Sequence, residues 1–418
     1  MTGQSERRQF WGVFCLALLL RLAYAWTQGP PLPIVGDAME YRAYALNLAE
    51  SGRYLGPAGE AATRMPGYPL FLAALHLLFG SSVTMILVVQ CVLGALTCAL
   101  LMRLAAEFLP APWPLACGLI SAGYFDLIEP SALLLTECLY ACVLALSAWA
   151  LYHRRWPPLR RALVYGLCSG ALYLIRPEPL PYILGTCLLL PYLFADMGRK
   201  EIGAALLGAA LVAGVWVGRN ALVFHRFLPG SSVGQNVKYI ALYLPAERQG
   251  LASSPRHVAP TSLGELERDA HMSRIYRELA ASMTWTQRAK ARLYNLLSVL
   301  YPFLPSYDWS YMTLFPFWLL GSWRAARRKP LWPLVGAVFC SLCIFPFFGG
   351  PVSRYRQGIS PFIVVLAVVG LHDAAQKLGT GRLLRWAGGW WGANAAVYLW
   401  SAQFRDAALY FKTVMGWR

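Results

Sequence analysis

Long apolar runs separated by short polar stretches set the pattern of this chain. A window of about 19 residues marks apolar segments at 10–28, 82–102, 113–128, 131–152, 162–175, 179–194, 203–222, 309–323, 331–348, 358–376 and 384–401. In lipid, the backbone polar groups of such segments must be satisfied internally, so each is expected to be helical. The pattern predicts an all-α polytopic membrane protein with about eleven spans.

Shorter apolar and amphipathic stretches predict further helices outside the spans. Residues 69–79 are apolar but too few to cross the bilayer, which predicts an interfacial or re-entrant helix. Residues 265–281 have helical spacing within a long polar loop. Polar hinges at Glu129-Pro130 and Arg176-Pro177 divide two close pairs of apolar segments, and such hinges are expected at an interface or a cavity.

Lys and Arg in the short loops fall on one side of this arrangement, which the positive-inside rule makes the cytoplasm. Five of the twenty acidic residues lie on that side and fifteen at the opposite face. The predicted organisation is an N-terminal transmembrane module at 1–222 with a first outer loop at 29–81, a large outer loop at 223–296, and C-terminal transmembrane helices at 297–418. The N-terminus is expected in the cytoplasm, with a signal anchor as the first span.

Composition agrees with a membrane protein, since 57% of the residues are hydrophobic and 14% are charged. The net charge of +17 does not indicate a nucleic-acid partner, because the basic residues lie in short clusters between apolar segments. All ten cysteines lie in apolar segments, which predicts no disulfide framework. Cys340 and Cys343 have a C-x-x-C spacing within a predicted helix, where packing is the favoured interpretation.

Acidic residues at the outer face are the first candidates for chemistry. On a helix beginning at Asp37, the residues Glu40, Tyr41, Tyr44 and Leu48 share one face. Asp37 with Glu40 also resembles a capping box, so capping alone stays open beside a chemical role. The second acidic site comprises Asp126 and Glu129 in FDLIEP at 125–130, with Glu137 further along the chain, because ionisable residues at the edge of a span mark sites with partners. A packing hydrogen bond is the alternative for Glu137.

A basic set is expected at the same membrane level. It comprises Arg176, Arg219, Lys238, Arg354 and Arg356, with Tyr355 between the last two. Each cation alone is explained equally well by snorkelling to lipid headgroups. Together they suit a phosphate, since the fork of arginine binds two phosphate oxygens at once.

These residues, in this order, resemble the GT-C superfamily of membrane glycosyltransferases, in particular the bacterial members related to protein O-mannosyltransferases and to the lipid A aminoarabinose transferase. The resemblance spans most of the chain. It rests on Asp37 with Tyr41 and Ala45, on the motif that begins at Arg64 (RMPGYPLFLA), on Thr136-Glu137, on LIRPE at 174–178, on VGRNALVFHRF at 217–227 and on SRYR at 353–356.

The resemblance implies a GT-C type transmembrane helix bundle in the bacterial inner membrane, with its active site on the periplasmic side. The donor would be a polyprenyl-phosphate monosaccharide, and the acceptor a lipid, glycan or protein. Asp37 matches the family's first-loop acid, the proposed base of a single inverting displacement. Arg354, Arg356, Lys238, Arg64 and Arg176 would bind the donor phosphate, and Glu40, Tyr41, Glu129, Glu137 and Tyr355 the substrates.

Departures from the family pattern leave alternatives open. Ala38 follows Asp37 where protein mannosyltransferases carry a second acid, which argues against a narrow assignment to them. The sequence ends at Arg418 without the large C-terminal soluble domain of many relatives, so the acceptor is left open. Some superfamily members need a divalent metal, but no His or carboxylate spacing here is typical of a metal site. A flippase of lipid-linked saccharides, or a polysaccharide polymerase or ligase with a lipid-diphosphate donor, is the alternative function. Transporters usually place their sites at the midplane between repeats, which favours the enzyme.

Overall fold

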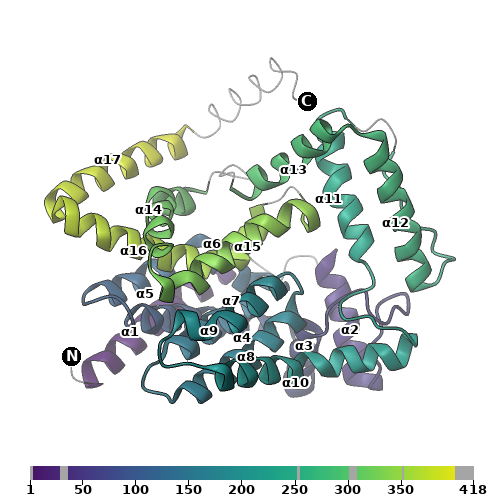
Figure 1. Cartoon of the computed structure of the whole chain (residues 1–418), viewed down its shortest axis with the longest axis horizontal. Helices are drawn as coiled ribbons and strands as arrows, with labels where there is room; N and C mark the ends of the chain where they lie inside the picture. The colour runs from purple at the N-terminus through teal and green to yellow at the C-terminus, as the bar shows by residue number, and fades with distance from the viewer. Residues whose placement is uncertain (1–2, 29–35, 252–254, 301–307, 351–352, 401–418) are drawn as a thin grey trace. The chain divides into compact units, whose positions relative to one another are not determined.

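The computed structural model describes residues 3–28, 36–251, 255–300, 308–350 and 353–400. Every regular element in these ranges is a helix (Figure 1). The first half of the chain forms α1 (Gly3–Thr27), α2 (Asp37–Ser51), α3 (Gly67–Phe79), α4 (Val83–Ala105), α5 (Trp113–Gly123), α6 (Phe125–Ile128), the 3-10 helix η1 (Glu129–Ala132), α7 (Glu137–Tyr152), α8 (Pro158–Ile175), α9 (Leu180–Leu193) and α10 (Arg199–Phe224). The second half forms α11 (Gly234–Arg248), α12 (Glu265–Ser282), α13 (Trp285–Leu300), α14 (Trp309–Ala325), η2 (Lys329–Leu331), α15 (Trp332–Phe348), η3 (Ser353–Gly358), α16 (Ser360–Leu378) and α17 (Thr380–Leu399).

Five helices are long and apolar enough to cross a membrane: Gln4–Thr27, Val83–Ala105, Arg199–Phe224, Lys329–Phe348 and Ser360–Leu378. The chain is therefore a multi-pass, all-helical membrane protein. The other predicted segments are also helical, but they are shorter, interrupted or less apolar, as in Trp113–Gly123 and Leu180–Leu193. The count of eleven spans stays a prediction. Predicted helices at residues 69–79 and 265–281 are confirmed as α3 and α12.

The helices pack into two compact units. Unit 1 holds residues 1–230, 314–338 and 357–374, and unit 2 holds residues 231–313, 339–356 and 375–418. Helices of the C-terminal part thus contribute to both units, whereas the sequence pattern groups them into one C-terminal module.

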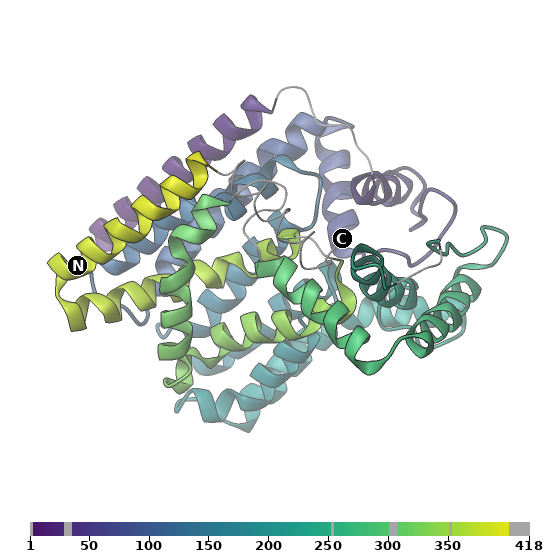
Figure 2. The ribbon, with the colours of Figure 1, turned by 90° about the horizontal axis from the view of Figure 1, so that it is seen from above.

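Small residues let helices of unit 1 approach closely. A Cβ on Gly166 of α8 would lie 2.1 Å from the carbonyl oxygen of Ala205 on α10, and one on Gly208 of α10 would lie 2.8 Å from that of Leu163. Glycine at such positions permits backbone contact between membrane helices. The two helices accordingly run side by side in Figure 1 and Figure 2.

A buried cation breaks one predicted span. Residues 113–128 form two helices, α5 and α6, separated by the extended Tyr124, rather than one helix. The guanidinium of Arg21, fully buried in α1, donates hydrogen bonds to the carbonyl oxygens of Ala122 at 3.4 Å and Leu127 at 2.9 Å. Because these carbonyls lie at the ends of α5 and α6, the cation satisfies acceptors that a continuous helix would use itself.

The helices α11, α12 and α13 pack together within unit 2 (Figure 2). Leu242 and Ala246 of α11 form an apolar cluster with Met283 and with Ala291 of α13. The carboxylate of Asp269 on α12 accepts a hydrogen bond of 2.9 Å from the backbone N–H of Gln235, at the beginning of α11. A carboxylate at a helix N-terminus is stabilising, so α12 holds α11 in place.

Candidate active site

The helix α2 begins at Asp37, as its apolar spacing predicts. Its N-cap is Gly36, whose backbone lies in the positive-φ region at 57°, and no side chain caps the helix. The capping-box interpretation of Asp37 and Glu40 is therefore wrong, because Asp37 is the first helical residue and its side chain contacts another partner. Both carboxylates are directed to Arg64 instead.

Arg64 joins the two acids of α2. Its Nη2 lies 2.7 Å from Oδ1 of Asp37, and its Nε lies 2.8 Å from Oε2 of Glu40. The three side chains keep between a quarter and about a third of their surface exposed, so the cluster is reachable from outside the protein. A guanidinium between two carboxylates fixes their orientation and offsets one of their two charges.

Tyr41 closes the same cluster. The Arg64 guanidinium lies 5.2 Å from the centre of its ring, and the ring meets that of Tyr68 edge to face. Burial raises the pKa of Tyr41 to about 12, with Arg64 acting against this shift and Asp37 adding to it. Tyr41 therefore stays protonated at neutral pH and offers a hydrogen-bond donor, not a base.

The loop that presents Arg64 is held by Arg219. The Arg219 guanidinium donates to the carbonyl oxygens of Ala61 at 2.7 Å and Tyr54 at 3.2 Å, and lies near the rings of Tyr54 and Trp216. The Tyr54 hydroxyl in turn donates to the carbonyl oxygen of Arg64 at 3.0 Å. Arg219, predicted within the basic set, thus positions the backbone of the first outer loop.

Arg176 and Glu137 form a second ion pair in unit 1. Arg176 Nη1 lies 3.5 Å from Oε1 of Glu137, and its Nε lies 3.6 Å from Oε1 of Glu178. Glu137 is almost completely buried and also accepts a hydrogen bond from the hydroxyl of Thr136 at 3.4 Å. The structure thus shows the packing hydrogen bond considered for Glu137 together with a cationic partner.

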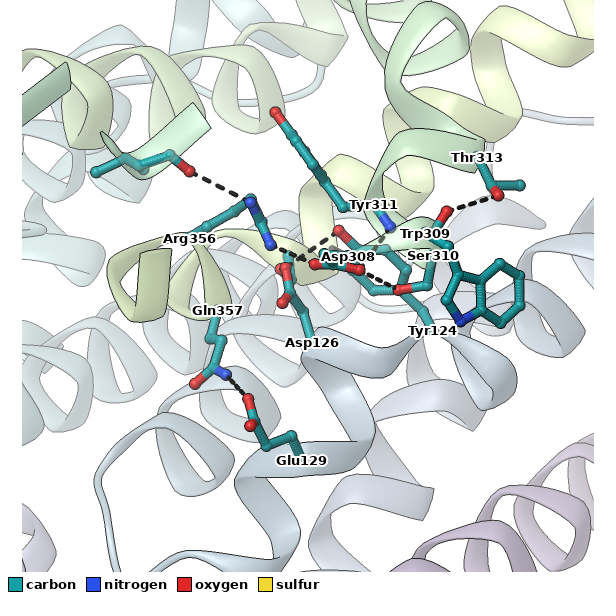
Figure 3. Close-up of polar contacts among 12 residues, drawn as sticks. Tyr124, Asp126, Glu129, Asp308, Trp309, Ser310, Tyr311, Thr313, Arg356 and Gln357 are labelled. Atoms are coloured by element: carbon teal, nitrogen blue, oxygen red, sulfur yellow. Dashed lines mark hydrogen bonds and ion pairs between the residues drawn. The ribbon is translucent and has the colours of Figure 1, made fainter. Parts of the chain in front are cut away.

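The hinge between α6 and α7 contacts the segment that leads into α16. The side-chain amide of Gln357 donates to Oε2 of Glu129 at 2.5 Å (Figure 3), and the hydroxyl of Ser360 donates to Oδ2 of Asp126 at 3.0 Å. Tyr124 donates to the same oxygen of Asp126 at 3.2 Å. Glu129 and Asp126 therefore bind the chain directly after the SRYR motif.

Arg356, the last residue of that motif, is buried in unit 2 (Figure 3). Its guanidinium forms an ion pair with Asp308, donates to the carbonyl oxygen of Val299 at 3.4 Å, and lies 3.8 Å from the centre of the Tyr311 ring. Oδ1 of Asp308 also accepts the backbone N–H of Tyr311 at 3.0 Å. The sequence pattern overlooked Asp308, although an Asp directly before an apolar helix is a typical N-cap.

The remaining predicted residues lie in unit 2. Lys238 on α11 has its Nζ 5.5 Å from the centre of the Phe348 ring. The ring of Tyr355 lies 5.2 Å from that of Phe345, and Arg354 precedes it on η3. Phosphate binding by Lys238 and Arg354, and substrate binding by Tyr355, stay predictions.

Charges are paired in this arrangement rather than segregated. The sequence predicts an acidic first loop with a basic set across from it, but Arg64 belongs to the first loop and pairs with its two acids. Arg176 and Arg356 also have carboxylate partners. Within the described residues, no group of three or more His, Cys, Asp or Glu side chains is placed to hold a metal ion.

Among the comparisons with known proteins, only the comparison of structures found a similarity. No family model matches the chain, and no curated protein matches its sequence. The structure is similar to that of the oligosaccharyltransferase of Archaeoglobus fulgidus, with a TM-score of 0.55 and 15% identity, over 92% of this chain and 52% of the other. The same enzyme tethered with an acceptor peptide containing the NVT sequon gives a TM-score of 0.48 at 13% identity, over 92% and 51% of the two chains. This chain spans about half the length of that enzyme, and the similarity shows a shared fold.

Proposed function

We propose that this protein is an inverting glycosyltransferase, which moves a monosaccharide from a polyprenyl-phosphate donor to an acceptor hydroxyl at the periplasmic face of a bacterial inner membrane. The observation that carries the proposal is the Asp37 carboxylate at the beginning of α2, accessible and oriented by Arg64 at 2.7 Å. A GT-C-like transmembrane fold supports a lipid-linked donor, because the long tail of such a donor stays in the bilayer.

The reaction is a single displacement. The acceptor oxygen attacks the anomeric carbon while its proton passes to the Asp37 carboxylate. The bond between the anomeric carbon and the phosphate oxygen breaks, and its electron pair leaves with the polyprenyl phosphate. Attack opposite the leaving group inverts the configuration. A positioned carboxylate contributes general-base catalysis of about 10²–10⁴-fold in comparable enzymes.

Cations assist the departing phosphate in this proposal. We assign two roles to Arg64, orienting the base and binding the phosphate, because its guanidinium is accessible and already contacts Asp37. Charge that develops on the leaving group is stabilised by preorganised donors, which cost no reorganisation during the reaction. The resemblance implies the same phosphate-binding role for Arg354, Arg356, Lys238 and Arg176. Glu40, Tyr41, Glu129, Glu137 and Tyr355 are the proposed sugar or acceptor contacts.

The experiment uses the full chain in lipid nanodiscs and a panel of labelled polyprenyl-phosphate sugars with hydroxyl acceptors. We expect release of the lipid phosphate together with a glycosylated product of inverted anomeric configuration. A product of retained configuration would exclude the single displacement.

Two further arms separate the alternative functions. Proteoliposomes loaded with a labelled lipid-linked saccharide test a flippase: movement of the intact lipid between leaflets without cleavage would contradict the transferase. Consumption of lipid-diphosphate donors alone would instead show a polymerase or ligase.

A further inference from the structure

The helix α13 buries two polar side chains beside two small apolar ones, and exposes large apolar side chains. Its buried positions are Ala291, Asn295, Ser298 and Val299. Two of them carry polar side chains that donate hydrogen bonds inside the protein: Asn295 donates to the carbonyl oxygen of Ala241 at 2.6 Å, and Ser298 to that of Tyr294 at 2.8 Å. A surface helix of a protein in water buries its apolar stripe, so the opposite face of α13 indicates a different environment.

Large apolar side chains lie on that opposite face. Trp285, Leu293 and Leu297 are 74%, 53% and 48% exposed, and they follow one another at intervals of eight and four residues. This spacing places them on one side of a helix of 3.6 residues per turn. An exposed apolar stripe of this length marks an interaction surface.

The helix α13 contacts the end of a candidate membrane span. The side chains of Arg292 and Asn295 both donate to the carbonyl oxygen of Pro346, at 2.8 and 3.1 Å, and Arg292 lies 4.9 Å from the centre of the Phe347 ring. Pro346 and Phe347 lie in the last turn of the candidate span Lys329–Phe348. Phe347 and Phe348 are themselves exposed, so the apolar face of α13 continues the surface of that span.

Exposed cations accompany the apolar stripe. Arg288 and Lys290 are exposed in the first turns of α13, next to Trp285. Tryptophan and basic residues beside an apolar helix face are typical of helices that lie in the plane of a membrane interface, where the cations contact lipid phosphates.

We propose that α13 is an interfacial helix that docks on the bilayer, in the leaflet at which α15 ends, with Trp285, Leu293 and Leu297 among the acyl chains and Arg288 and Lys290 at the lipid phosphates. The sequence places residues 223–296 in an aqueous loop, so this assigns its last helix to the membrane surface. Because α13 packs on α11, the helix that carries Lys238 is then supported from the bilayer.

The test introduces a photo-crosslinking side chain into the full protein in nanodiscs of phosphatidylethanolamine and phosphatidylglycerol. Leu293→p-benzoylphenylalanine is expected to form a covalent adduct with phospholipid on illumination, detected as a mass increase of the intact protein. The matched control is Arg274→p-benzoylphenylalanine at an exposed position of α12, where we expect no lipid adduct.

Other outcomes would overturn the proposal. Adducts between two copies of the chain at position 293, without lipid, would identify the stripe as a protein interface. Equal lipid adducts at positions 293 and 274 would show that lipid contact is not specific to α13. If the first variant does not insert, Leu297→p-benzoylphenylalanine probes the same face. None of these readouts requires catalysis, so the result is independent of the proposed function.

Discussion

At the scale of single residues, the contact between Arg64 and Asp37 determines how strong a base the site contains. A guanidinium 2.7 Å from a carboxylate favours the ionised form, which keeps the base available at neutral pH but lowers its proton affinity. Glu40 at 2.8 Å from the same guanidinium weakens this effect, since the two acids share one cation. The ion pair thus keeps the Asp37 carboxylate ionised at the cost of a lower affinity for the acceptor's proton.

Removing that cation should change the pH dependence of the reaction. In Arg64→Met, the ionised form of Asp37 loses its cationic partner and lies beside Glu40, so we expect the acid limb of kcat/KM to move to higher pH. The pH profile of lipid-phosphate release measures the shift. Arg53→Met, at an exposed position of the same loop, is the control and should leave the limb in place. An unmoved limb in Arg64→Met would separate Arg64 from the base.

The buried pair of Arg176 and Glu137 makes a prediction about stability. Arg176→Met leaves the Glu137 carboxylate, 2% exposed, without this cation, and breaking a buried pair in this way costs about 3 kcal/mol. Thermal unfolding in detergent should show the loss. Glu137→Gln combined with Arg176→Met should recover part of it, because the position with the least exposed carboxylate of the pair is then neutral. A double variant as unstable as Arg176→Met would argue against electrostatic coupling.

At the scale of elements, glycine packing determines how closely α14 and α16 approach each other in unit 1. A Cβ on Gly321 would lie 1.7 Å from the carbonyl oxygen of Leu366, and one on Gly370 would lie 2.1 Å from that of Phe317. Two helices that meet backbone to backbone at two reciprocal points have no flexible side chain to move aside.

Adding a methyl group at this contact should be strongly destabilising. We expect Gly321→Ala to lower the free energy of unfolding by about 3 kcal/mol, because the helices must separate. Gly336→Ala on α15, where a Cβ meets nothing within 4 Å, is the matched control and should be neutral or slightly stabilising. Equal melting temperatures for the two variants would show that α14 and α16 do not meet at Gly321.

The local sequence pattern predicted where helices form better than it predicted where a helix is interrupted. The spacing from Asp37 to Leu48 predicted α2, and the apolar run at 69–79 predicted α3. The break at Tyr124 was missed because its cause, Arg21, lies about a hundred residues earlier in the chain. The ion pairs of Arg64 were not predicted for the same reason, since its partners lie 24 and 27 residues away along the chain. Asp308 carried a local N-cap pattern that the surrounding apolar run obscured.

At the scale of the whole molecule, orientation in the membrane remains a prediction from the basic loops. Ala58→Cys, exposed in the first outer loop, should react with a membrane-impermeant thiol reagent in intact cells. Arg154→Cys, exposed between α7 and α8, should react only after the membrane is made permeable. The parent protein gives the background of its native cysteines. Labelling of position 154 in intact cells would reverse the proposed topology.

The contacts of the proposed base belong to one of the two units. The chain covers about half of the archaeal oligosaccharyltransferase to which its fold is similar. The proposed base, its guanidinium partner and the Arg219 support all lie in unit 1. The contacts that orient the proposed base therefore lie within one compact unit, whereas Lys238, Arg354 and Arg356, proposed for the donor phosphate, belong to unit 2.

The role of Asp37 as the base is tested most directly by a single-turnover measurement. Asp37→Asn and Glu50→Gln, which removes an exposed carboxylate from the other end of α2, are compared with the parent at saturating labelled donor and acceptor. The account predicts that Asp37→Asn binds the donor but forms product at least about a hundredfold more slowly, while Glu50→Gln matches the parent. A folded, inserted Asp37→Asn protein that forms product at the parental rate would contradict it.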